Sequence, residues 1–285
     1  MIESVVIRNL CGVGQGRLGP FGRVNLLMGP NGSGKTTILE ALHLSASSWR
    51  PCMAGAVPAF TTTLPGIAKT VSLESAPDET LPEVDAEILE GSRITYLWNS
   101  PLVRSAGGED AQDFAVWAIQ GQPARHTFFL RDEQADAPLP QMTEHVLERM
   151  RAIFPRETRF EVPYLSGGER RAFAILTGAD ALSVATAEEP GLLLWEYPEY
   201  ALDVENLGAL IGQVWDILRA NGHFQAFVST HSLEVIEAVT CRSWPQGPGL
   251  RAFRLGLKKG RLFYATFERH NLDFWLEEGL DPRKW

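Results

Sequence analysis

The most constraining feature of this chain is the octapeptide GPNGSGKT at residues 29–36, together with the segments on either side of it. Residues 24–28 form a short apolar run typical of a buried strand, and residues 36–45 continue with helical periodicity. Three glycines in the octapeptide permit a backbone turn that directs several N–H groups toward one anion. The sequence therefore predicts a strand, a phosphate-binding loop and a helix in succession, which is a unit of α/β folds.

The polar groups of this loop have predicted roles toward a nucleoside triphosphate. Lys35 reaches the β- and γ-phosphates, and the Thr36 hydroxyl binds Mg²⁺. The helix that follows presents its N-terminus, with a partial positive charge, to the same phosphates. We therefore predict ATP and Mg²⁺ as ligands. The predicted nucleotide-binding residues of the loop are Gly29, Pro30, Asn31, Gly32, Ser33, Gly34, Lys35, Thr36 and Thr37.

A second glycine motif, LSGGE at residues 165–169, precedes a predicted helix over residues 170–187. Ser166 can cap that helix, while Gly167 and Gly168 allow the backbone to approach a phosphate. Taken alone, the motif is also compatible with an ordinary helix N-cap that has an acidic residue in its first turn. Its assignment therefore depends on the other motifs of the chain.

Two further motifs follow predicted buried strands. The segment LLLWEYPEYALD at residues 192–203 places Glu196 and Tyr197 after a strand over residues 192–195. The segment STHSLE at residues 229–234 places His231 after a strand over residues 224–229. Predicted helices over residues 204–220 and 233–239 follow, and this alternation favours a mainly parallel sheet.

The four motifs, in this order, resemble those of the ATP-binding-cassette (ABC) superfamily. The resemblance implies that Ser166, Gly167 and Gly168 cap the γ-phosphate held by another subunit, which gives a head-to-tail homodimer with two ATP molecules at its interface. It also implies that His231 contacts the γ-phosphate. The Ala-Leu-Asp sequence at residues 201–203 matches the loop by which subunits of that superfamily sense each other.

Both ends of the chain resemble one branch of this superfamily. The opening MIESVVIRNLCGVG and the segment FGRVNLLMGPNGSGKTTILEAL are similar to the start of RecF, SMC and OLD-type ATPases. YPEYALD, FVSTHSLEVIEAV and a strand-plus-helix tail resemble stand-alone OLD-like ATPases. A transporter motor domain is disfavoured, because 131 residues separate Lys35 from Ser166 and no Tyr or Trp precedes the glycine loop. The resemblance implies a nuclease or effector protein as partner, DNA as a further candidate, and a role in DNA transactions or anti-phage defence.

The segment after the strand over residues 192–195 departs from the superfamily pattern. Aligned on residues 201–203, Glu196 takes the position of the magnesium-binding Asp and Tyr197 that of the catalytic Glu. A tyrosine, neutral at pH 7 with an ordinary pKa of about 10, cannot polarise water as a carboxylate does. An alternative alignment places Trp195 at the metal position and Glu196 as the base, but loses the match at residues 201–203. Glu199 lies nearby in the sequence and could serve as the base, although the sequence does not show where its side chain points. The candidate catalytic residues are Glu196, Tyr197, Glu199 and His231, and the candidate metal ligands are Thr36 and Glu196.

We predict a single α/β head over residues 1–285, namely a P-loop NTPase ABC-ATPase head with a mainly parallel sheet flanked by helices and an antiparallel β subdomain. Residues 1–49 and 160–285 would form the nucleotide-binding core, and about 50–159 an inserted lobe. A strand is expected over 2–8 and a glycine-rich turn over 12–22. In the lobe we expect a loop over 50–65, strands over 84–89, 93–98, 114–119 and 126–131, and a helix over 143–154.

Composition narrows the class of partner. The net charge of −9 and the pI near 5.2 give no general attraction to nucleic acid or anionic membrane. Any DNA contact must come from a local basic patch, for which a solvated edge is the competing interpretation. That patch would consist of Arg242, Arg251, Arg254, Lys258, Lys259 and Arg261. The resemblance to ABC proteins also implies a glutamine that reports magnesium to the adjoining lobe. Gln120 and Gln122 are candidates for it, and the alternative is that both are surface polar residues.

No segment approaches the roughly 20 apolar residues that span a bilayer, and the N-terminus lacks the apolar region of a signal peptide. Three widely separated cysteines give neither a disulfide framework nor a metal spacing, and we expect them to be buried small side chains. The sequence thus predicts a cytoplasmic protein that does not interact with membranes. We expect an ATP-dependent switch with slow hydrolysis, with a non-hydrolysing ATP-bound scaffold or regulatory subunit as the alternative.

Overall fold

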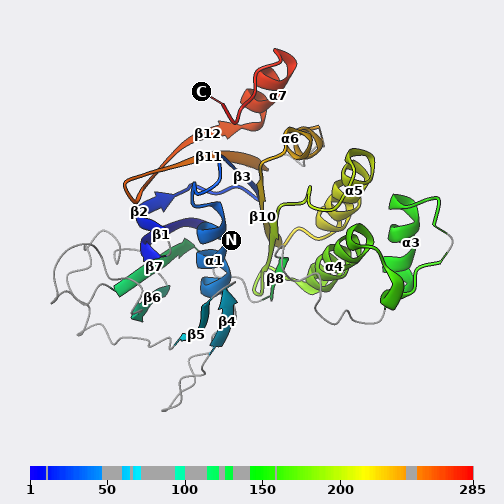
Figure 1. The fold of residues 1–285 in the computed structure, drawn as a ribbon, viewed down its shortest axis with the longest axis horizontal. Coiled ribbons are helices and arrows are strands. Elements are labelled where there is room, and N and C mark those ends of the chain that lie inside the picture. The colour runs from blue at the N-terminus through cyan, green and yellow to red at the C-terminus, as the bar shows by residue number, and fades with distance from the viewer. Residues whose placement is uncertain are drawn as a thin grey trace.

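The computed structural model describes residues 1–10, 12–46, 60–64, 67–71, 94–99, 114–121, 126–130, 142–157, 159–241 and 249–284. Figure 1 shows the arrangement of the elements. The strands are β1 (Ile2–Leu10), β2 (Val13–Leu18), β3 (Val24–Met28), β4 (Phe60–Leu64), β5 (Ile67–Val71), β6 (Ile94–Asn99), β7 (Phe114–Gly121), β8 (His126–Leu130), β9 (Gly191–Glu196), β10 (Phe224–Thr230), β11 (Leu250–Lys258) and β12 (Arg261–Glu268). The helices are α1 (Lys35–Ala46), α3 (Glu144–Ile153), α4 (Gly167–Ala181), α5 (Val204–Ala220), α6 (Leu233–Thr240) and α7 (Arg269–Glu277), with short 3-10 turns at Val162–Tyr164 and Leu182–Val184.

A ten-stranded sheet in the order β6-β7-β1-β2-β12-β11-β3-β10-β9-β8 organises the molecule. Within it, β11, β3, β10, β9 and β8 run parallel to one another. Every residue of β3, β9 and β10 is buried, and most of these residues are apolar, as expected for strands that are covered on both faces. Because β3, β10 and β9 are consecutive and parallel, the loops that follow them meet at one edge of the sheet. That edge collects the glycine loop, Glu196 and His231.

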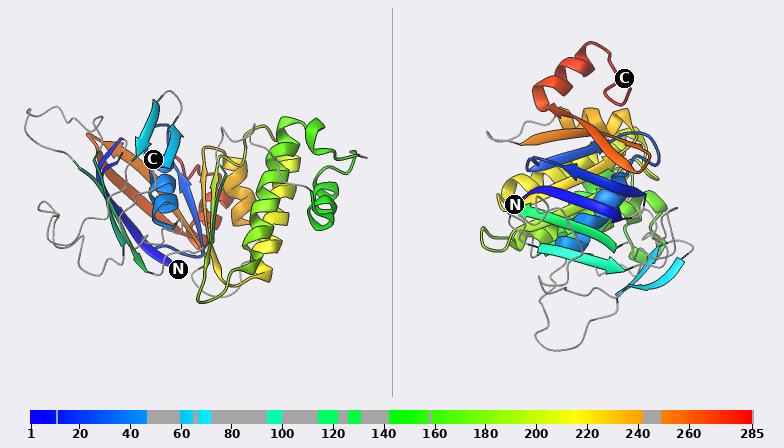
Figure 2. Two further views of the ribbon diagram at one scale, coloured as in Figure 1. Left: turned by 90° about the horizontal axis from the view of Figure 1, so that it is seen from below. Right: turned by 90° about the vertical axis from the view of Figure 1, so that its left-hand side faces the viewer.

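The remaining strands of this sheet are mainly antiparallel. β1 pairs with β2 and β7, β6 with β7, and β12 with β11, while β4 and β5 pair with each other in a separate small sheet. The two halves of the large sheet diverge around α1, which lies between them (Figure 2). Apolar residues of α1 form one core with β1, β2 and the inner side of the parallel strands. Helices α3 to α7 form the other core, on the opposite face.

The predicted α/β fold with a mainly parallel sheet flanked by helices is confirmed, because five of the nine neighbouring strand pairs in the large sheet are parallel and the other four are antiparallel. The strands predicted around residues 24–28, 192–195 and 224–229 and the helices predicted around 143–154 and 204–220 are present. The predicted strand over 84–89 lies outside the described residues. The division into a core and an inserted lobe at about residues 50 and 160 stays a prediction; β6, β7 and β8 from that interval belong to the large sheet.

The turn predicted over residues 12–22 is wrong, because β2 occupies most of it. β2 contains Gly14 and Gly16, which lower its intrinsic strand propensity and suggested a turn. The structure gives a packing reason for both glycines. A Cβ at Gly16 would lie 2.5 Å from the Cβ of Leu262, and one at Gly14 would lie 3.2 Å from the Gly260 carbonyl oxygen. The glycines therefore allow β12 to approach β2 closely.

Three smaller expectations are also corrected. Residues 60–64, predicted to lie in a loop, form β4. The helix predicted over 170–187 begins at Gly167, because Ser166 caps it, and ends at Ala181 before a 3-10 turn. Cys241 is exposed rather than buried, since it follows α6 at the surface. Among the helices that the structure describes, none has both the length and the apolar character to cross a bilayer.

Candidate functional site

The glycine loop joins β3 to α1 at the edge where β3, β9 and β10 end (Figure 1). Gly29, Gly32 and Gly34 have φ angles of 145°, 73° and 92°, which residues with side chains rarely adopt. A Cβ at Gly29 would also lie 2.5 Å from the carbonyl oxygen of Leu255. The loop therefore turns tightly and brings the free N–H groups at the start of α1 to this edge, where they can bind an anion.

Lys35 is the first residue of α1 and is only 3% exposed. Its Nζ donates hydrogen bonds to the carbonyl oxygens of Gly29 and Pro30, each at 2.9 Å. Burial lowers the pKa of Lys35 to about 8, while the carboxylates of Glu199 and Glu196 act in the opposite direction. The ammonium therefore remains mostly charged at pH 7 and lies against the loop predicted to bind phosphates.

Glu196 ends β9 and reaches the start of α1. The Thr36 hydroxyl donates a hydrogen bond to Oε1 of Glu196 at 2.5 Å, so the two candidate metal ligands converge. Both provide the oxygen atoms that Mg²⁺ prefers. Trp195, the metal position in the alternative alignment, is fully buried in the core between the sheet and helices α3 to α7. Glu196, and not Trp195, therefore contacts the other candidate metal ligand, and the assignment of Tyr197 to the position of the catalytic Glu stays a prediction.

The donor set also fits the way Mg²⁺ binds to proteins. Among the residues that the structure describes, no group of three or more His, Cys, Asp or Glu side chains could hold a metal ion. Mg²⁺ is usually held by one or two carboxylates, with waters and substrate phosphates completing its coordination. The pair Thr36 and Glu196 therefore suits Mg²⁺ bound together with a nucleotide better than a metal held by protein ligands alone.

Tyr197 occupies the centre of the cluster. Its φ of 47° is unusual for a residue with a large side chain, and its N–H donates to the Ser229 carbonyl at 2.9 Å. The ring stacks on the imidazole of His231, with centroids 4.9 Å apart and planes 16° from parallel. The Nζ of Lys35 lies 5.9 Å from the centroid of the same ring. The phenol ring therefore has a cation and an imidazole as neighbours.

The carboxylate of Glu199 faces the same cluster, which the sequence alone did not reveal. Its Oε1 accepts hydrogen bonds from the Thr230 hydroxyl and from the His231 N–H, both at 2.9 Å. Its Oε2 is shielded from bulk solvent and has no hydrogen-bond partner among the described residues. A buried acceptor of this kind usually binds an ordered water or a ligand. Among the nearby acidic residues, Glu199 has the largest effect on the pKa of Lys35.

His231 lies in the turn between β10 and α6, and its ring faces the glycine loop. Its Nδ1 is 2.9 Å from the Gly29 carbonyl oxygen, so Nδ1 carries the proton in this contact and Nε2 is an acceptor. Burial lowers the pKa of His231, and the charge of Lys35 lowers it further. Burial and the charge of Lys35 thus favour the neutral form of the imidazole.

The second glycine motif lies at the exposed N-terminus of α4. Ser166 caps the helix in a reciprocal arrangement with Glu169, whose Oε2 accepts from the Ser166 N–H at 2.7 Å and from its hydroxyl at 2.6 Å. A Cβ at Gly168 would lie 2.5 Å from the carbonyl oxygen of Ala201, so the start of α4 packs closely against residues 201–203. Gly167 is exposed beside them.

Arg171 is a residue of this region that sequence reasoning missed. It is 4% exposed, and its Nη2 donates to the carbonyl oxygens of Glu196 and Tyr197, the latter at 2.9 Å. Its guanidinium also lies 5.4 Å from the centroid of the Tyr200 ring. Arg171 thereby connects α4 to the turn after β9. An arginine at an inward-facing position of a helix could have suggested this role.

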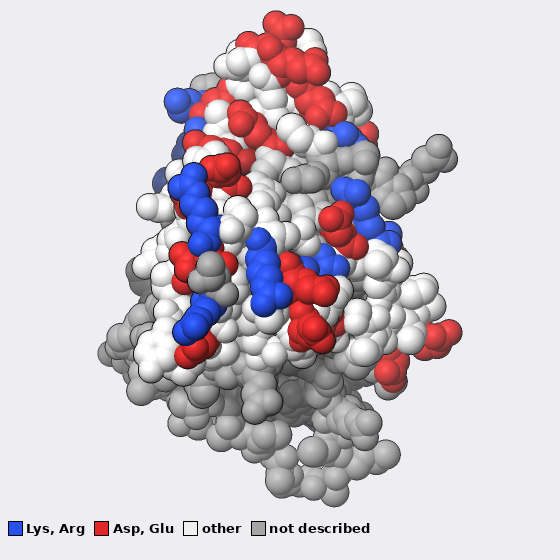
Figure 3. Space-filling view, turned by 90° about the vertical axis from the view of Figure 1, so that its right-hand side faces the viewer, with Lys and Arg blue, Asp and Glu red and all other residues white. Residues whose placement is uncertain are grey.

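The weaker candidates that the structure describes are the basic residues of the tail. Arg251, Arg254, Lys258, Lys259 and Arg261 are on β11, on β12 and in the turn between them. Arg242, Gln122 and the side chain of Gln120 lie outside the described residues. On the face shown in Figure 3, blue and red side chains are interspersed, and acidic residues gather toward α7. The described part of this face therefore offers no strong positive field for a nucleic acid.

Two comparisons with known proteins match a short segment of this chain. A family model described as an AAA domain matches residues 4–48. The DNA replication and repair protein RecF of Azotobacter vinelandii is 58% identical over 43 residues, which are 15% of this chain and 11% of that protein. The chain therefore spans only about a tenth of the length of that relative.

Two solved structures are similar to this chain over most of its length. The SmcHead bound to the C-winged helix domain of ScpA matches with a TM-score of 0.50 at 12% identity, over 94% of this chain and 97% of that one. The SMC head domain from Thermotoga maritima matches with a TM-score of 0.47 at 17% identity, over 94% and 99%. At such low identity, these likenesses concern the fold alone.

Proposed function

We propose that this chain, which has the fold of an ABC-type ATPase of the RecF/SMC class, is an ATP-driven switch that closes as a head-to-tail homodimer. The main support is the convergence of Lys35, Glu196 and His231 on one glycine loop at a helix N-terminus. An ammonium, a carboxylate beside a hydroxyl and a neutral imidazole are groups suited to a nucleoside triphosphate with Mg²⁺.

ATP binding would replace contacts that the site already makes within itself. The phosphate oxygens would take over the hydrogen bonds that Lys35 Nζ gives to Gly29 and Pro30, and charged acceptors form stronger bonds than carbonyls. Thr36 and Glu196 would hold the Mg²⁺, which neutralises charge on the β- and γ-phosphates when bound. The N–H groups of the glycine loop and of α1 would complete the cradle.

Hydrolysis requires a base, and we assign that role to Glu199. Its Oε2 has no hydrogen-bond partner among the described residues, and the carboxylate affects the charge of Lys35 and contacts His231 through Oε1. We therefore propose that Oε2 holds one water and takes its proton. Oε1 is fixed by two hydrogen bonds, so the carboxylate is oriented in advance. His231 presents Nε2 to the same region as a second acceptor. Glu199 would therefore supply the carboxylate that Tyr197 lacks.

Introducing a carboxylate at the Tyr197 position tests the alignment. In the preferred alignment, Tyr197→Glu should raise ATP turnover by about tenfold or more, because a positioned base contributes about 10²–10⁴-fold in rate. Steady-state phosphate release would measure it, with Tyr197→Phe as the control that keeps the ring stacked on His231. Unchanged turnover in Tyr197→Glu, with ATP binding retained, would argue against the alignment.

A second copy of the chain is needed to complete the site. The glycine loop and α1 belong to one side of the sheet, whereas α4 with Ser166 belongs to the helical layer on the other (Figure 2). Ser166, Gly167 and residues 201–203 are largely exposed around the start of α4. A head-to-tail pair would place this motif over the γ-phosphate of the partner, and the phosphate would then compete with Glu169 for the Ser166 hydroxyl.

Blocking the surface around Ser166 should prevent dimer formation without affecting ATP binding. We expect Ser166→Arg to bind ATP as the wild type does but to stay monomeric, because a large cation would fill the space between the subunits. Nucleotide titration and sedimentation velocity with a nonhydrolysable ATP analogue would measure the two properties. Lost ATP binding in a folded Ser166→Arg protein would contradict capping by the partner.

The protein partner of the proposed switch is inferred only from the class of ATPase that the chain resembles. The SMC head named above was solved with a domain of ScpA, and we propose that this chain likewise engages a protein, namely a nuclease or effector in DNA transactions or anti-phage defence. The stacked Tyr197 favours one alternative, a non-hydrolysing scaffold in which bound ATP only supports assembly. Phosphate release from the wild type and Lys35→Ala separates the two, because equal rates would exclude the enzyme and leave the scaffold.

A further inference from the structure

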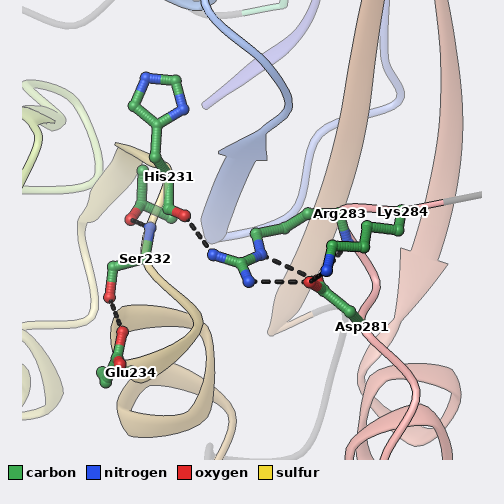
Figure 4. Close-up of polar contacts among 7 residues, drawn as sticks. His231, Ser232, Glu234, Asp281, Arg283 and Lys284 are labelled. Carbon is green, nitrogen blue, oxygen red and sulfur yellow. Dashed lines mark hydrogen bonds and ion pairs between the residues drawn. The ribbon is translucent and has the colours of Figure 1, made fainter.

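Residues 279–284 fold back from α7 onto the turn that contains His231 (Figure 4). α7 ends at Glu277. Gly279, with a φ of 68°, reverses the chain just after the helix, and the Leu280 N–H donates to the Trp275 carbonyl at 2.7 Å. This leads the chain to Asp281, Arg283 and Lys284, which lie beside the loop between β10 and α6. Two segments more than forty residues apart in sequence are thereby joined next to the nucleotide site.

Asp281 holds Arg283 in one orientation. Oδ1 of Asp281 accepts from the N–H and the Nε of Arg283, at 2.9 and 2.8 Å, and Oδ2 accepts from Nη2 at 2.7 Å. The hydrogen bond from the Arg283 side chain is the main reason that the pKa of Asp281 falls to about 2. The carboxylate is therefore ionised, and the bidentate pair fixes the planar guanidinium.

The third nitrogen of this guanidinium, Nη1, contacts the backbone of His231. Nη1 of Arg283 donates a hydrogen bond to the backbone carbonyl of His231. The N–H of His231 donates to Glu199, and its Nδ1 is bonded to the Gly29 carbonyl. The backbone and Nδ1 of His231 are thus held by three separate segments, and Nε2 has no hydrogen-bond partner in the part of the chain that the structure describes.

We infer that Arg283 is a positioning residue for His231, so that residues 279–284 set where Nε2 points during the proposed reaction. The inference rests on the proposed function, in which His231 acts beside the γ-phosphate. Among the described residues, Arg283 donates hydrogen bonds to Asp281 and His231 and to no residue of the glycine loop. Loss of Arg283 should therefore disturb the step that uses His231 and leave ATP binding through Lys35 intact.

Kinetics on the full chain test this role. Arg283→Ala should lower kcat by about tenfold or more, as expected for a residue that orients a functional side chain, and leave the Kd for ATP within about twofold of the wild type. Arg283→Lys should recover part of kcat, because an ammonium can still donate to the carbonyl. Asp281→Asn, which weakens the orientation of Arg283 but keeps its charge, should give an intermediate kcat.

Lys284→Ala is the matched control, because Lys284 also pairs with Asp281, at 3.6 Å, but is largely exposed. Lys284→Ala should have the kcat and the Kd for ATP of the wild type. An unchanged kcat in Arg283→Ala would overturn the inference. Equal losses of kcat and of thermal stability in Arg283→Ala and Lys284→Ala would also overturn it, because they would show that residues 279–284 only stabilise the fold.

Amide hydrogen exchange distinguishes failure of this inference from failure of the proposed function. If the wild type shows no turnover that depends on Lys35, the proposed catalysis fails, but the positioning of His231 can still be measured. Arg283→Ala should then speed exchange at residues 231–235 in the nucleotide-free protein, and Lys284→Ala should not. Unchanged amide exchange at residues 231–235 in Arg283→Ala would contradict the positioning role, whether or not the protein hydrolyses ATP.

Discussion

Replacing Lys35 with alanine is expected to weaken ATP binding by about a hundredfold or more and to abolish turnover. Lys35 is a nearly buried cation whose hydrogen bonds would pass to the phosphates, and removing a desolvated charged donor costs about 2–5 kcal/mol. Calorimetric titration with ATP and Mg²⁺ would measure the loss. Lys258→Ala, on the exposed end of β11, is the control and should bind as the wild type does.

The pKa of Lys35 adds a pH signature to the same experiment. Because burial lowers that pKa to about 8, the free protein loses the ammonium as the pH rises through 8, whereas bound phosphates favour the charged form. ATP affinity should therefore be highest below pH 8 and fall above it. Lys35→Ala should lack this dependence. Full ATP binding by Lys35→Ala would exclude the glycine loop as the nucleotide site.

Replacing Glu199 with glutamine should lower kcat by about 10²–10⁴-fold and leave ATP binding and ATP-dependent dimer formation intact. Glutamine retains an oxygen acceptor for the Thr230 hydroxyl and the His231 N–H, so the turn after β10 should keep its shape. It cannot take a proton from water. Single-turnover phosphate release would measure the rate, with Glu205→Gln in the exposed first turn of α5 as the control.

A second substitution sharpens that test. If Glu199 is the base that replaces the missing carboxylate at Tyr197, the double variant Tyr197→Glu with Glu199→Gln should recover turnover relative to Glu199→Gln alone. Wild-type turnover in Glu199→Gln would show that the base lies elsewhere. Glu196→Gln would then be the next substitution, because the alternative alignment makes Glu196 the base.

The elements that depend on local pattern could be predicted from the sequence. The apolar run over residues 24–28 and the amphipathic segment over 204–220 coincide with β3 and α5, since periodicity and caps determine such elements. β2 could not be predicted, because its glycines are explained by the approach of β12, a contact between residues far apart in sequence. Long-range packing of this kind leaves little trace in a local window.

The candidate site shows the same contrast. Three of the motifs indicated which residues gather around the glycine loop, because they follow β3, β9 and β10, which are adjacent and parallel. The direction of Glu199 could not be predicted, since it depends on the turn that starts with the positive φ of Tyr197. Arg171 and Arg283 act through backbone carbonyls, which have no side-chain signature. Their roles became visible only in three dimensions.

Mixing two inactive variants tests the central claim most directly. In a head-to-tail dimer, Lys35 of one subunit and Ser166 of the other serve the same ATP, so a pair of Lys35→Ala with Ser166→Arg contains one intact site and one doubly altered site. We expect each variant alone to stay monomeric with the nonhydrolysable analogue, and the mixture to form dimers by sedimentation velocity. A mixture that remains monomeric, under conditions in which the wild type dimerises, would contradict the account.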